Sequence, residues 1–192
     1  MLLSEIDRYG RAHKIPMVLD DTLKLLCDTI KSHECKRILE IGTAIGYSAI
    51  AMATYCDVEK IVTLEIDDDR YKLAKINIAK AHMEDTIENK KIDAFEYIKD
   101  SKEKFDFIFL DGPKGQYIKY LPYLINMLDK GGIIFADNVY FHGMVAGQIP
   151  TPKSVMTLVR NLQKYNDAVK INNQLQTKFY DVGDGVAISI KK

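Results

Sequence analysis

The chain has 192 residues, of which 47% are hydrophobic and 28% charged, with 11 glycines and 5 prolines. This composition is typical of a globular domain and excludes a disordered tail, a collagen-like chain and a disulfide-rich mini-protein. Lysine plus arginine and aspartate plus glutamate both number 27, so the formal net charge is zero. A nucleic acid would therefore have to bind at a local basic patch, because no global positive field attracts it.

The cysteine count and the apolar runs indicate the compartment. Cys27, Cys35 and Cys56 are an odd number without CxxC spacing, so we expect buried free thiols in a reducing environment. No run approaches the roughly 20 apolar residues that span a bilayer. Acidic residues at positions 5 and 7 and the lack of a small-residue cleavage site argue against a signal peptide. We expect one cytoplasmic domain over residues 1–192, without membrane contact.

Hydrophobic periodicity predicts the elements in chain order. Two helices, at 2–11 and 20–31, come first. Short apolar runs then predict strands at 37–42, 60–67, around Ile87, and at 105–111, 131–138, 168–174 and 185–190. Helical patterns between them cover 47–56, 69–83, 94–99, 118–127 and 154–165. Residues 139–152 have no clear periodicity, so we expect a loop there.

The alternation of strands and helices predicts an α/β fold. Because the strands are continuous apolar runs, we expect a mostly parallel sheet with helices on both faces. Ligands of such sheets bind beyond the carboxyl ends of the strands. Four successive strands finish with acidic or amide side chains, which are Glu40, Glu65, Asp111, and Asp137 with Asn138. This repetition is the strongest functional signal in the sequence.

The sequence EIGTAIG at residues 40–46 lies between a predicted strand and a predicted helix. Glycines there permit positive φ and let a ligand approach the backbone closely. Ala44 stands where the dinucleotide fingerprint has its second glycine, which counts against NAD. Glu65 ends the next strand, where a carboxylate can accept both ribose hydroxyls of an adenosine. The alternative for the glycine turn and Glu65 is a tight turn with a helix-capping acid. Asp93, which precedes the predicted helix at 94–99, can be the N-cap of that helix.

Asp111, Asp137 and Asn138 predict a metal site if their strands are neighbours. Oxygen-only ligands suit a hard ion such as Mg²⁺, whereas zinc would prefer His or Cys. Lys114, three residues after Asp111, is a candidate general base, because a nearby cation would lower its pKa. The alternative is that these are ordinary turn residues, since Asp and Asn are common in turns.

Three motifs together resemble the metal-dependent O-methyltransferases, a family that includes the catechol and caffeoyl-CoA O-methyltransferases. They are EIGTAIGYS at 40–48, FLDGPKGQY at 109–117 and ADNV at 136–139, in the order found in the family. The KGQY version of the lysine motif and the segment IPMV at 15–18 most resemble the bacterial tRNA 5-hydroxyuridine methyltransferases. The match at Gly112-Pro113 is looser, since relatives often carry other small residues there.

The resemblance implies a Rossmann-like class I methyltransferase fold. Its expected features are a seven-stranded sheet with an antiparallel C-terminal hairpin, helices over residues 1–32 as a family-specific cap, and a homodimer. It also implies site roles. Contacts with S-adenosylmethionine fall on Met17, Val18, Gly42, Ser48, Glu65, Asp93, Ala94 and Asp111. Mg²⁺ would bind Asp111, Asp137 and Asn138, and Lys114 would be the general base. Tyr117 and His142 are candidates for substrate contact, although a polar loop residue is the favoured interpretation of His142.

The expected reaction is S-adenosylmethionine-dependent, Mg²⁺-assisted O-methylation of 5-hydroxyuridine at the tRNA wobble position, with the anticodon loop as partner. Tyr140, Phe141 and His142 offer rings on which a splayed base can stack. Candidate cations for the RNA are Arg8, Arg11, Lys14, Lys114, Lys119 and Lys153. The alternative is O-methylation of a small catechol or phenol, for which the same rings would form a lid. A third interpretation is a non-catalytic module that binds an adenosine nucleotide.

Overall fold

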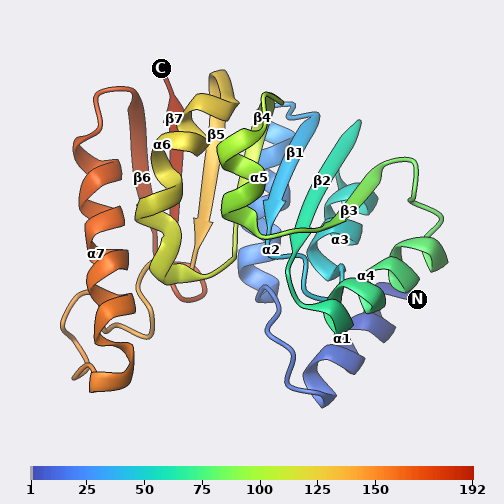
Figure 1. Cartoon of the computed structure of the whole chain (residues 1–192), viewed down its shortest axis with the longest axis horizontal. Helices are drawn as coiled ribbons and strands as arrows, with labels where there is room; N and C mark the ends of the chain where they lie inside the picture. The colour runs from blue at the N-terminus through green and yellow to red at the C-terminus, as the bar shows by residue number, and fades with distance from the viewer. Residues whose placement is uncertain (1) are drawn as a thin grey trace.

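The computed structural model describes residues 2–192, and its strands form one seven-stranded sheet with helices on both faces (Figure 1). The strands are β1 (Arg37–Ile41), β2 (Lys60–Glu65), β3 (Ile87–Lys91), β4 (Phe105–Leu110), β5 (Leu128–Asp137), β6 (Leu175–Tyr180) and β7 (Val186–Lys191). The helices are α1 (Leu2–Ala12), α2 (Asp20–Ser32), α3 (Tyr47–Tyr55), α4 (Asp68–Lys80), α5 (Ala94–Asp100), α6 (Tyr117–Met127) and α7 (Met156–Ile171). Two short 3₁₀ helices are η1 (Lys114–Gln116) and η2 (Lys153–Val155).

The strand order is β3-β2-β1-β4-β5-β7-β6. Strands β1 to β5 pair in parallel, and β7 is antiparallel to both β5 and β6. The predicted fold class, a mostly parallel sheet with an antiparallel C-terminal hairpin, is therefore confirmed. The chain reverses its direction of progress across the sheet between β1 and β4, which is the topological switch point where open α/β sheets bind ligands.

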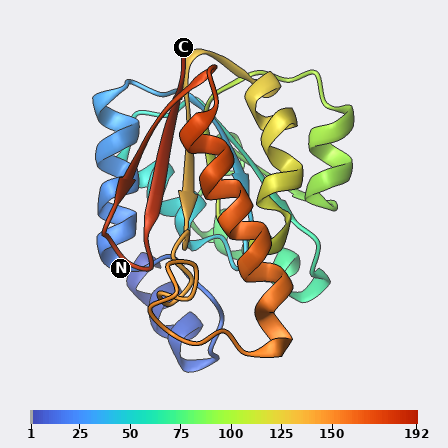
Figure 2. The same ribbon diagram turned by 90° about the vertical axis from the view of Figure 1, so that its left-hand side faces the viewer.

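The core consists of two apolar layers, because successive strand residues face opposite sides of the sheet. Leu39, Ile108 and Ile134 belong to the layer that packs against α5, α6 and α7. Ile38 and Phe135 belong to the layer that packs against α1 to α4. Figure 2 shows the sheet between α2 (blue) and the pair α5 and α6 (green and yellow). Both faces are thus covered, and the strand ends remain for function.

The strand predicted at 168–174 is wrong. Helix α7 continues to Ile171, and β6 begins only at Leu175. The buried residues Leu162, Tyr165 and Val169 extend the apolar face of the helix at helical spacing. Packing of this face against the sheet keeps the last turn of α7 helical, although it contains the β-branched residues Val169 and Ile171. The other predicted elements are present, with ends displaced by a few residues.

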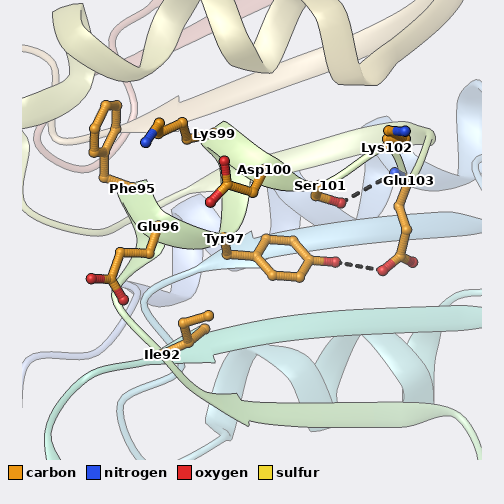
Figure 3. A pocket seen from close by; sticks show the side chains of 9 residues that line it. All are labelled: Ile92, Phe95, Glu96, Tyr97, Lys99, Asp100, Ser101, Lys102 and Glu103. Carbon is orange, nitrogen blue, oxygen red and sulfur yellow. Dashed lines mark hydrogen bonds between the residues drawn. The ribbon is translucent and has the colours of Figure 1, made fainter.

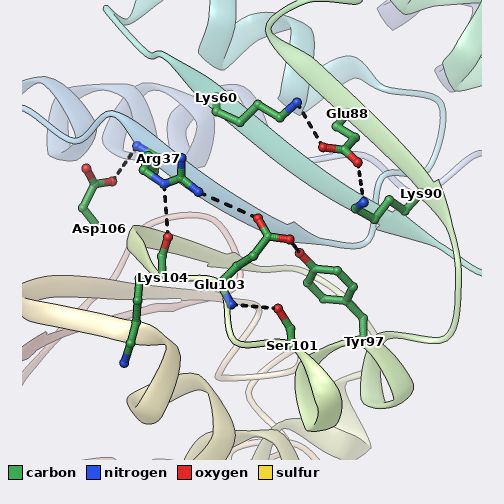
Figure 4. Close-up of polar contacts among 9 residues, drawn as sticks. All are labelled: Arg37, Lys60, Glu88, Lys90, Tyr97, Ser101, Glu103, Lys104 and Asp106. Carbon is green, nitrogen blue, oxygen red and sulfur yellow. Dashed lines mark hydrogen bonds and ion pairs between the residues drawn. The ribbon is translucent and has the colours of Figure 1, made fainter.

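Polar contacts hold the segment before β4 against the start of β1 (Figure 4). Asp106 accepts hydrogen bonds from the backbone N–H groups of Lys36 and Arg37, at 2.8 and 2.9 Å. The Tyr97 hydroxyl donates to Glu103 at 2.8 Å, and the Arg37 guanidinium lies 3.8 Å from the same carboxylate. These contacts lie at the amino-terminal end of β1, so they align the strands away from the ligand-binding edge.

The cysteines are buried free thiols, as predicted. Burial raises the pKa of the Cys35 thiol to about 12, which keeps it protonated. Among residues 2–192, no helix has both the length and the apolar character needed to cross a bilayer.

Candidate active site

A cleft of about 360 Å³ lies at the carboxyl ends of β1, β2, β3 and β4. Its lining includes Gly42, Glu65, Asp93 and Asp111, one residue from each of these strand ends. Small-molecule sites have volumes of roughly 300–1,000 Å³, so the cleft has a suitable size for a cofactor. The ends of β1, β2 and β4, three of the strand ends that the sequence predicted to carry a ligand, meet here on both sides of the topological switch point.

A second hollow, of about 900 Å³, lies along α5 (Figure 3). Ile92, residues 95–97 and residues 99–103 line it, with the Tyr97 ring in its wall and the Tyr97 hydroxyl bonded to Glu103. Its walls come from one stretch of chain, and Glu96, Lys99 and Asp100 are exposed to solvent. We therefore place the candidate site in the smaller cleft, where buried acids from several strands converge.

The glycine turn brings the ends of β1 and β4 into contact. Gly42 has φ +107°, and a Cβ atom there would lie 2.5 Å from the backbone oxygen of Asp111. The Asp111 N–H donates to the Ile41 carbonyl at 3.1 Å. No residue with a side chain fits this approach, which explains why glycine is required. Ala44, with φ 46°, also has a left-handed backbone.

The Glu65 carboxylate is held in the floor of the cleft by backbone donors. Its Oε2 accepts the N–H of Ala44 at 2.9 Å, and its Oε1 accepts the N–H groups of Ile66 and Asp67, each at 2.9 Å. A carboxylate has about four acceptor positions, so one position on Oε2 remains for a ligand hydroxyl. This single side chain joins the glycine turn to the end of β2.

Asp93 and Ala94 line the same cleft. The Asp93 carboxylate accepts the backbone N–H groups of Phe95 and Glu96, at 2.8 and 3.1 Å. Asp93 is therefore the N-cap of α5, as the alternative interpretation proposed. Since the cap also faces the cleft, its position is compatible with a cofactor contact, which stays a prediction.

Glu40, one of the acidic strand ends noted in the sequence, forms a buried polar centre below the glycine turn, a role that the sequence interpretation missed. It is fully buried and accepts hydrogen bonds from the hydroxyls of Ser48 and Thr63. Burial raises the pKa of Glu40 to about 7, although the two hydroxyl donors oppose this rise. Ser48, predicted as a cofactor contact, instead has its hydroxyl bonded to Glu40 and does not line the cleft. An acid two residues before the first glycine of the turn was the signal available in the sequence.

Asp111 and Asp137 lie on neighbouring parallel strands, as the metal hypothesis requires. They follow Leu110 and Ala136, which are paired residues of β4 and β5. Burial and the charge of Asp111 raise the pKa of Asp137 to about 7, and burial raises the pKa of Asp111. Two buried carboxylates that repel each other are the environment that a divalent cation stabilises.

Asn138 directly follows Asp137 and has a left-handed backbone with φ 56°. Its N–H donates to Asp137 Oδ1 at 2.7 Å. Within residues 2–192, no site groups three or more His, Cys, Asp or Glu side chains suitable for a metal. The predicted set has two carboxylates and one amide, and this oxygen-only chemistry fits a hard cation with water and substrate as further ligands.

Lys114 lies in η1, at the border of the cleft. Its Nζ donates to Asp111 Oδ1 at 2.7 Å, and both side chains are largely buried. The structure therefore brings together the candidate base and a candidate metal ligand.

The other predicted contacts lie elsewhere. Val18 is buried among apolar residues, and Pro16 from the same segment lines the cleft. Tyr117 is wrong as a substrate contact, because it is fully buried and its hydroxyl donates to the Leu110 carbonyl. His142 is exposed, with Nδ1 3.5 Å from the Asp184 carboxylate.

Comparison with known proteins agrees with this geometry. The O-methyltransferase family profile matches residues 1–192. The chain belongs to the O-methyltransferase family. A caffeoyl-CoA O-methyltransferase of Medicago sativa is 30% identical over 177 residues, which cover 88% of this chain and 72% of that protein. The enzyme is therefore an S-adenosylmethionine-dependent O-methyltransferase, and the predicted enzyme class is confirmed.

Solved structures extend the likeness to the whole fold. An O-methyltransferase of Bacillus cereus, solved with S-adenosylhomocysteine, has a TM-score of 0.87 at 25% identity and covers 100% of this chain and 90% of that one. A methyltransferase of Podospora anserina, also with S-adenosylhomocysteine, has a TM-score of 0.88 at 26% identity, covering 100% and 88%. A Staphylococcus aureus protein has a TM-score of 0.91 at 31% identity, covering 99% and 92%.

Proposed function

We propose that the enzyme transfers a methyl group to a ring hydroxyl that has a second oxygen beside it, with a divalent cation held by Asp111, Asp137 and Asn138. The observation that carries this proposal is the position of Asp111. It lines the cofactor-sized cleft and also lies beside the buried carboxylate of Asp137. One residue therefore borders both the methyl-donor side and the acceptor side.

S-adenosylmethionine, when bound, supplies the methyl group, and a divalent cation lowers the pKa of an acceptor hydroxyl. The chain itself supplies alignment and proton handling. Methyl transfer is an in-line displacement, so the contribution of the protein is to fix the acceptor oxygen opposite the donor methyl. Gly42 and Glu65 would hold the donor in the cleft. Lys114, at its border, would take the hydroxyl proton as a neutral amine, so its ammonium form must first leave its contact with Asp111 and release its own proton.

For the acceptor, we propose a small catechol or related phenol. Relatives of the chain include several plant caffeoyl-CoA O-methyltransferases, and that similarity favours a phenolic acceptor. A catechol presents two adjacent oxygens, which matches a site with few protein ligands. Part of the loop at 139–152 supports a lid role, because Tyr140 and Phe141 are half-buried and pack against the core.

A second acceptor is 5-hydroxyuridine in the anticodon loop of tRNA, whose 5-hydroxyl lies beside the 4-carbonyl oxygen. The observation that favours it is the set of exposed cations near the chain segments that flank the site. Arg8, Lys14 and Lys153 are exposed and form no ion pair with any of residues 2–192. Such residues are free to contact phosphates. The predicted homodimer and cap role of the N-terminal helices stay predictions.

One assay separates the acceptors. Purified enzyme with labelled S-adenosylmethionine is offered a panel of catechols, and tRNA bearing 5-hydroxyuridine, at low salt with Mg²⁺ or EDTA. We expect cation-dependent labelling of a catechol. Labelling of the tRNA alone, falling steeply with salt and weakened by K153E, would replace the phenolic acceptor by the RNA. Transfer that persists in EDTA would contradict the metal-assisted reaction for either acceptor.

A further inference from the structure

We propose that Asp184 is a positioning residue that fixes the segment carrying Asn138, and so sets the affinity of the site for its cation. This inference rests on the proposed function. Asp184 lies in the turn between β6 and β7, distant in sequence from every predicted site residue. It touches neither the cofactor cleft nor a predicted ligand by hydrogen bond. It acts through the backbone of residues 139–142, and its negative charge also reaches the Asp137 carboxylate.

The hairpin turn continues the sheet beyond the end of β5. The last antiparallel pair of β5 and β7 is Asp137 with Val186. Past that pair, the Val139 N–H donates to the Gly185 carbonyl at 3.0 Å, and the Tyr140 N–H donates to the Asp184 carbonyl at 3.0 Å. The residues directly after the predicted ligands are therefore paired with the turn.

The side chain of Asp184 closes this contact. Its Oδ1 accepts the backbone N–H of His142 at 2.6 Å, and its Oδ2 lies 3.5 Å from His142 Nδ1. Only 16% of the Asp184 side chain is exposed, against 71% for His142. Asp184 thus holds the loop at two points: its carbonyl accepts the N–H of Tyr140, and its carboxylate accepts the N–H of His142.

The segment needs such support because its backbone is strained. Asn138, Phe141 and His142 have φ values of 56°, 45° and 56°, in the left-handed region that side chains disfavour. Conformations of this kind persist only where surrounding contacts determine them. Without the Asp184 carboxylate, Phe141 and His142 would relax toward ordinary φ values. The Phe141 N–H donates to the Asn138 carbonyl at 3.3 Å, so this relaxation would loosen the turn that begins at Asn138.

Two neighbours share the work of holding this segment. A Cβ atom on Gly185 would lie 2.4 Å from the Tyr140 ring, so the ring packs directly on the turn. The Asn166 side-chain amide donates to the Val139 carbonyl at 2.8 Å. Both contacts precede residue 141 in the chain, whereas Asp184 alone of the three reaches His142. Beyond the loop's own backbone hydrogen bonds, this carboxylate is therefore the one of these three contacts that holds the second half of the turn.

The variants D184A and D184N test the proposal, with D181A as the matched control. Asp181 is an exposed aspartate of the same hairpin whose side chain makes no hydrogen bond within residues 2–192. The measurements are Mn²⁺ affinity and S-adenosylhomocysteine affinity by calorimetry, and amide hydrogen exchange of peptides covering 138–144. All are made on the full chain without an acceptor, so none depends on turnover.

We expect D184A to weaken Mn²⁺ binding roughly tenfold or more, as partners that orient metal ligands commonly do, and to speed exchange in 138–144. S-adenosylhomocysteine affinity should stay within about twofold, since the cleft lies on other strand ends. D184N keeps an acceptor oxygen and should restore most of both properties. D181A should match the wild type.

Unchanged amide hydrogen exchange of residues 138–144 in D184A would overturn the proposal. A D184N variant with Mn²⁺ affinity as low as that of D184A would also overturn it, because the charge of Asp184 and not its contact with the loop would then set the affinity. D137A separates the two levels of inference. If D137A retains full Mn²⁺ affinity, the proposed cation site fails, and the exchange of 138–144 in D184A alone decides whether Asp184 fixes this segment.

Discussion

The Lys114 ammonium group donates a hydrogen bond to Asp111 Oδ1 at 2.7 Å, so the candidate general base is paired with a candidate metal ligand. The pair partly offsets the burial that raises the pKa of Asp111. A cation bound to Asp111 would compete with the ammonium group for the same oxygen. Lys114 would then be displaced toward the acceptor, so cation binding at Asp111 would free the candidate base.

Removal of Lys114 should therefore impair chemistry more than binding. We expect K114A to lower kcat by roughly 10² to 10⁴-fold, the usual range for a general base, with S-adenosylmethionine affinity nearly unchanged. Steady-state kinetics together with calorimetry measure both quantities. K119A is the control, because Lys119 is exposed and its ammonium lies over the Phe95 ring, 3.4 Å from the centroid. A wild-type kcat in K114A would exclude this lysine as the base.

Asp137 tests the metal hypothesis without the risk of unfolding. We expect D137N to abolish turnover, because an amide binds a divalent cation far more weakly than a carboxylate. Its free energy of unfolding should not fall, since the change removes a buried carboxylate whose pKa burial and Asp111 raise to about 7. Turnover assays measure the activity of D137N, and thermal denaturation measures its stability. EDTA should reproduce the activity loss in the wild type, and Mg²⁺ should reverse it; activity in both cases would be inconsistent with a metal at this site.

Glu65 should determine cofactor affinity. We expect E65A to weaken S-adenosylmethionine binding by about 1–3 kcal/mol, because three backbone N–H groups lose their acceptor together with the ligand. Titration calorimetry measures the change. E59Q, an exposed glutamate before β2, serves as the control. Equal affinities for E65A and the wild type would place the cofactor outside this cleft.

Glu40 should make stability depend on pH. Its pKa is about 7 in the folded chain, against 4.5 for an ordinary glutamate. Below pH 4.5 both folded and unfolded states hold the proton. Between these two values only the folded state holds it, so the free energy of unfolding falls as pH rises and levels off above the folded pKa. The total fall is roughly 3 kcal/mol, since one pKa unit corresponds to about 1.4 kcal/mol.

Denaturant unfolding of the wild type and of E40Q between about pH 4 and pH 8 measures this effect. Glutamine stays neutral, so the stability of the wild type relative to E40Q should decline with rising pH in that window. Other buried acids, such as Asp137, cancel in the comparison because both proteins contain them. A difference that is independent of pH would show that the Glu40 pKa is not raised by folding.

Much of the site could be predicted because its residues follow strands that the sequence marks clearly. Buried parallel strands are continuous apolar runs, and the residue after each run must lie at the ligand-binding edge. Gly42, Glu65 and Asp111 were found in this way and Asp93 through the family resemblance, and all four line one cleft. Local pattern alone thus determined the fold class and which strand ends carry the chemistry.

Side-chain destinations, by contrast, depend on contacts between segments distant in sequence. Ser48 has the residue type of a cofactor ligand, yet its hydroxyl is bonded to Glu40, and Tyr117 is fully buried beneath the strand that carries the motif. The first part of the strand expected at 168–174, up to Ile171, became part of α7 because packing against the sheet outweighs β propensity.

Asp184 shows the same division most clearly. Nothing in its sequence neighbourhood marks it, since Val182 to Gly185 form an ordinary hairpin turn. Only the pairing of β5 with β7 places this turn against the loop after Asn138. The sequence by itself determined the elements and the chemistry at their ends, because those follow from periodicity over a few residues. The tertiary structure decided which of these groups meet, because hydrogen bonds and packing between distant segments exist only after the sheet has formed.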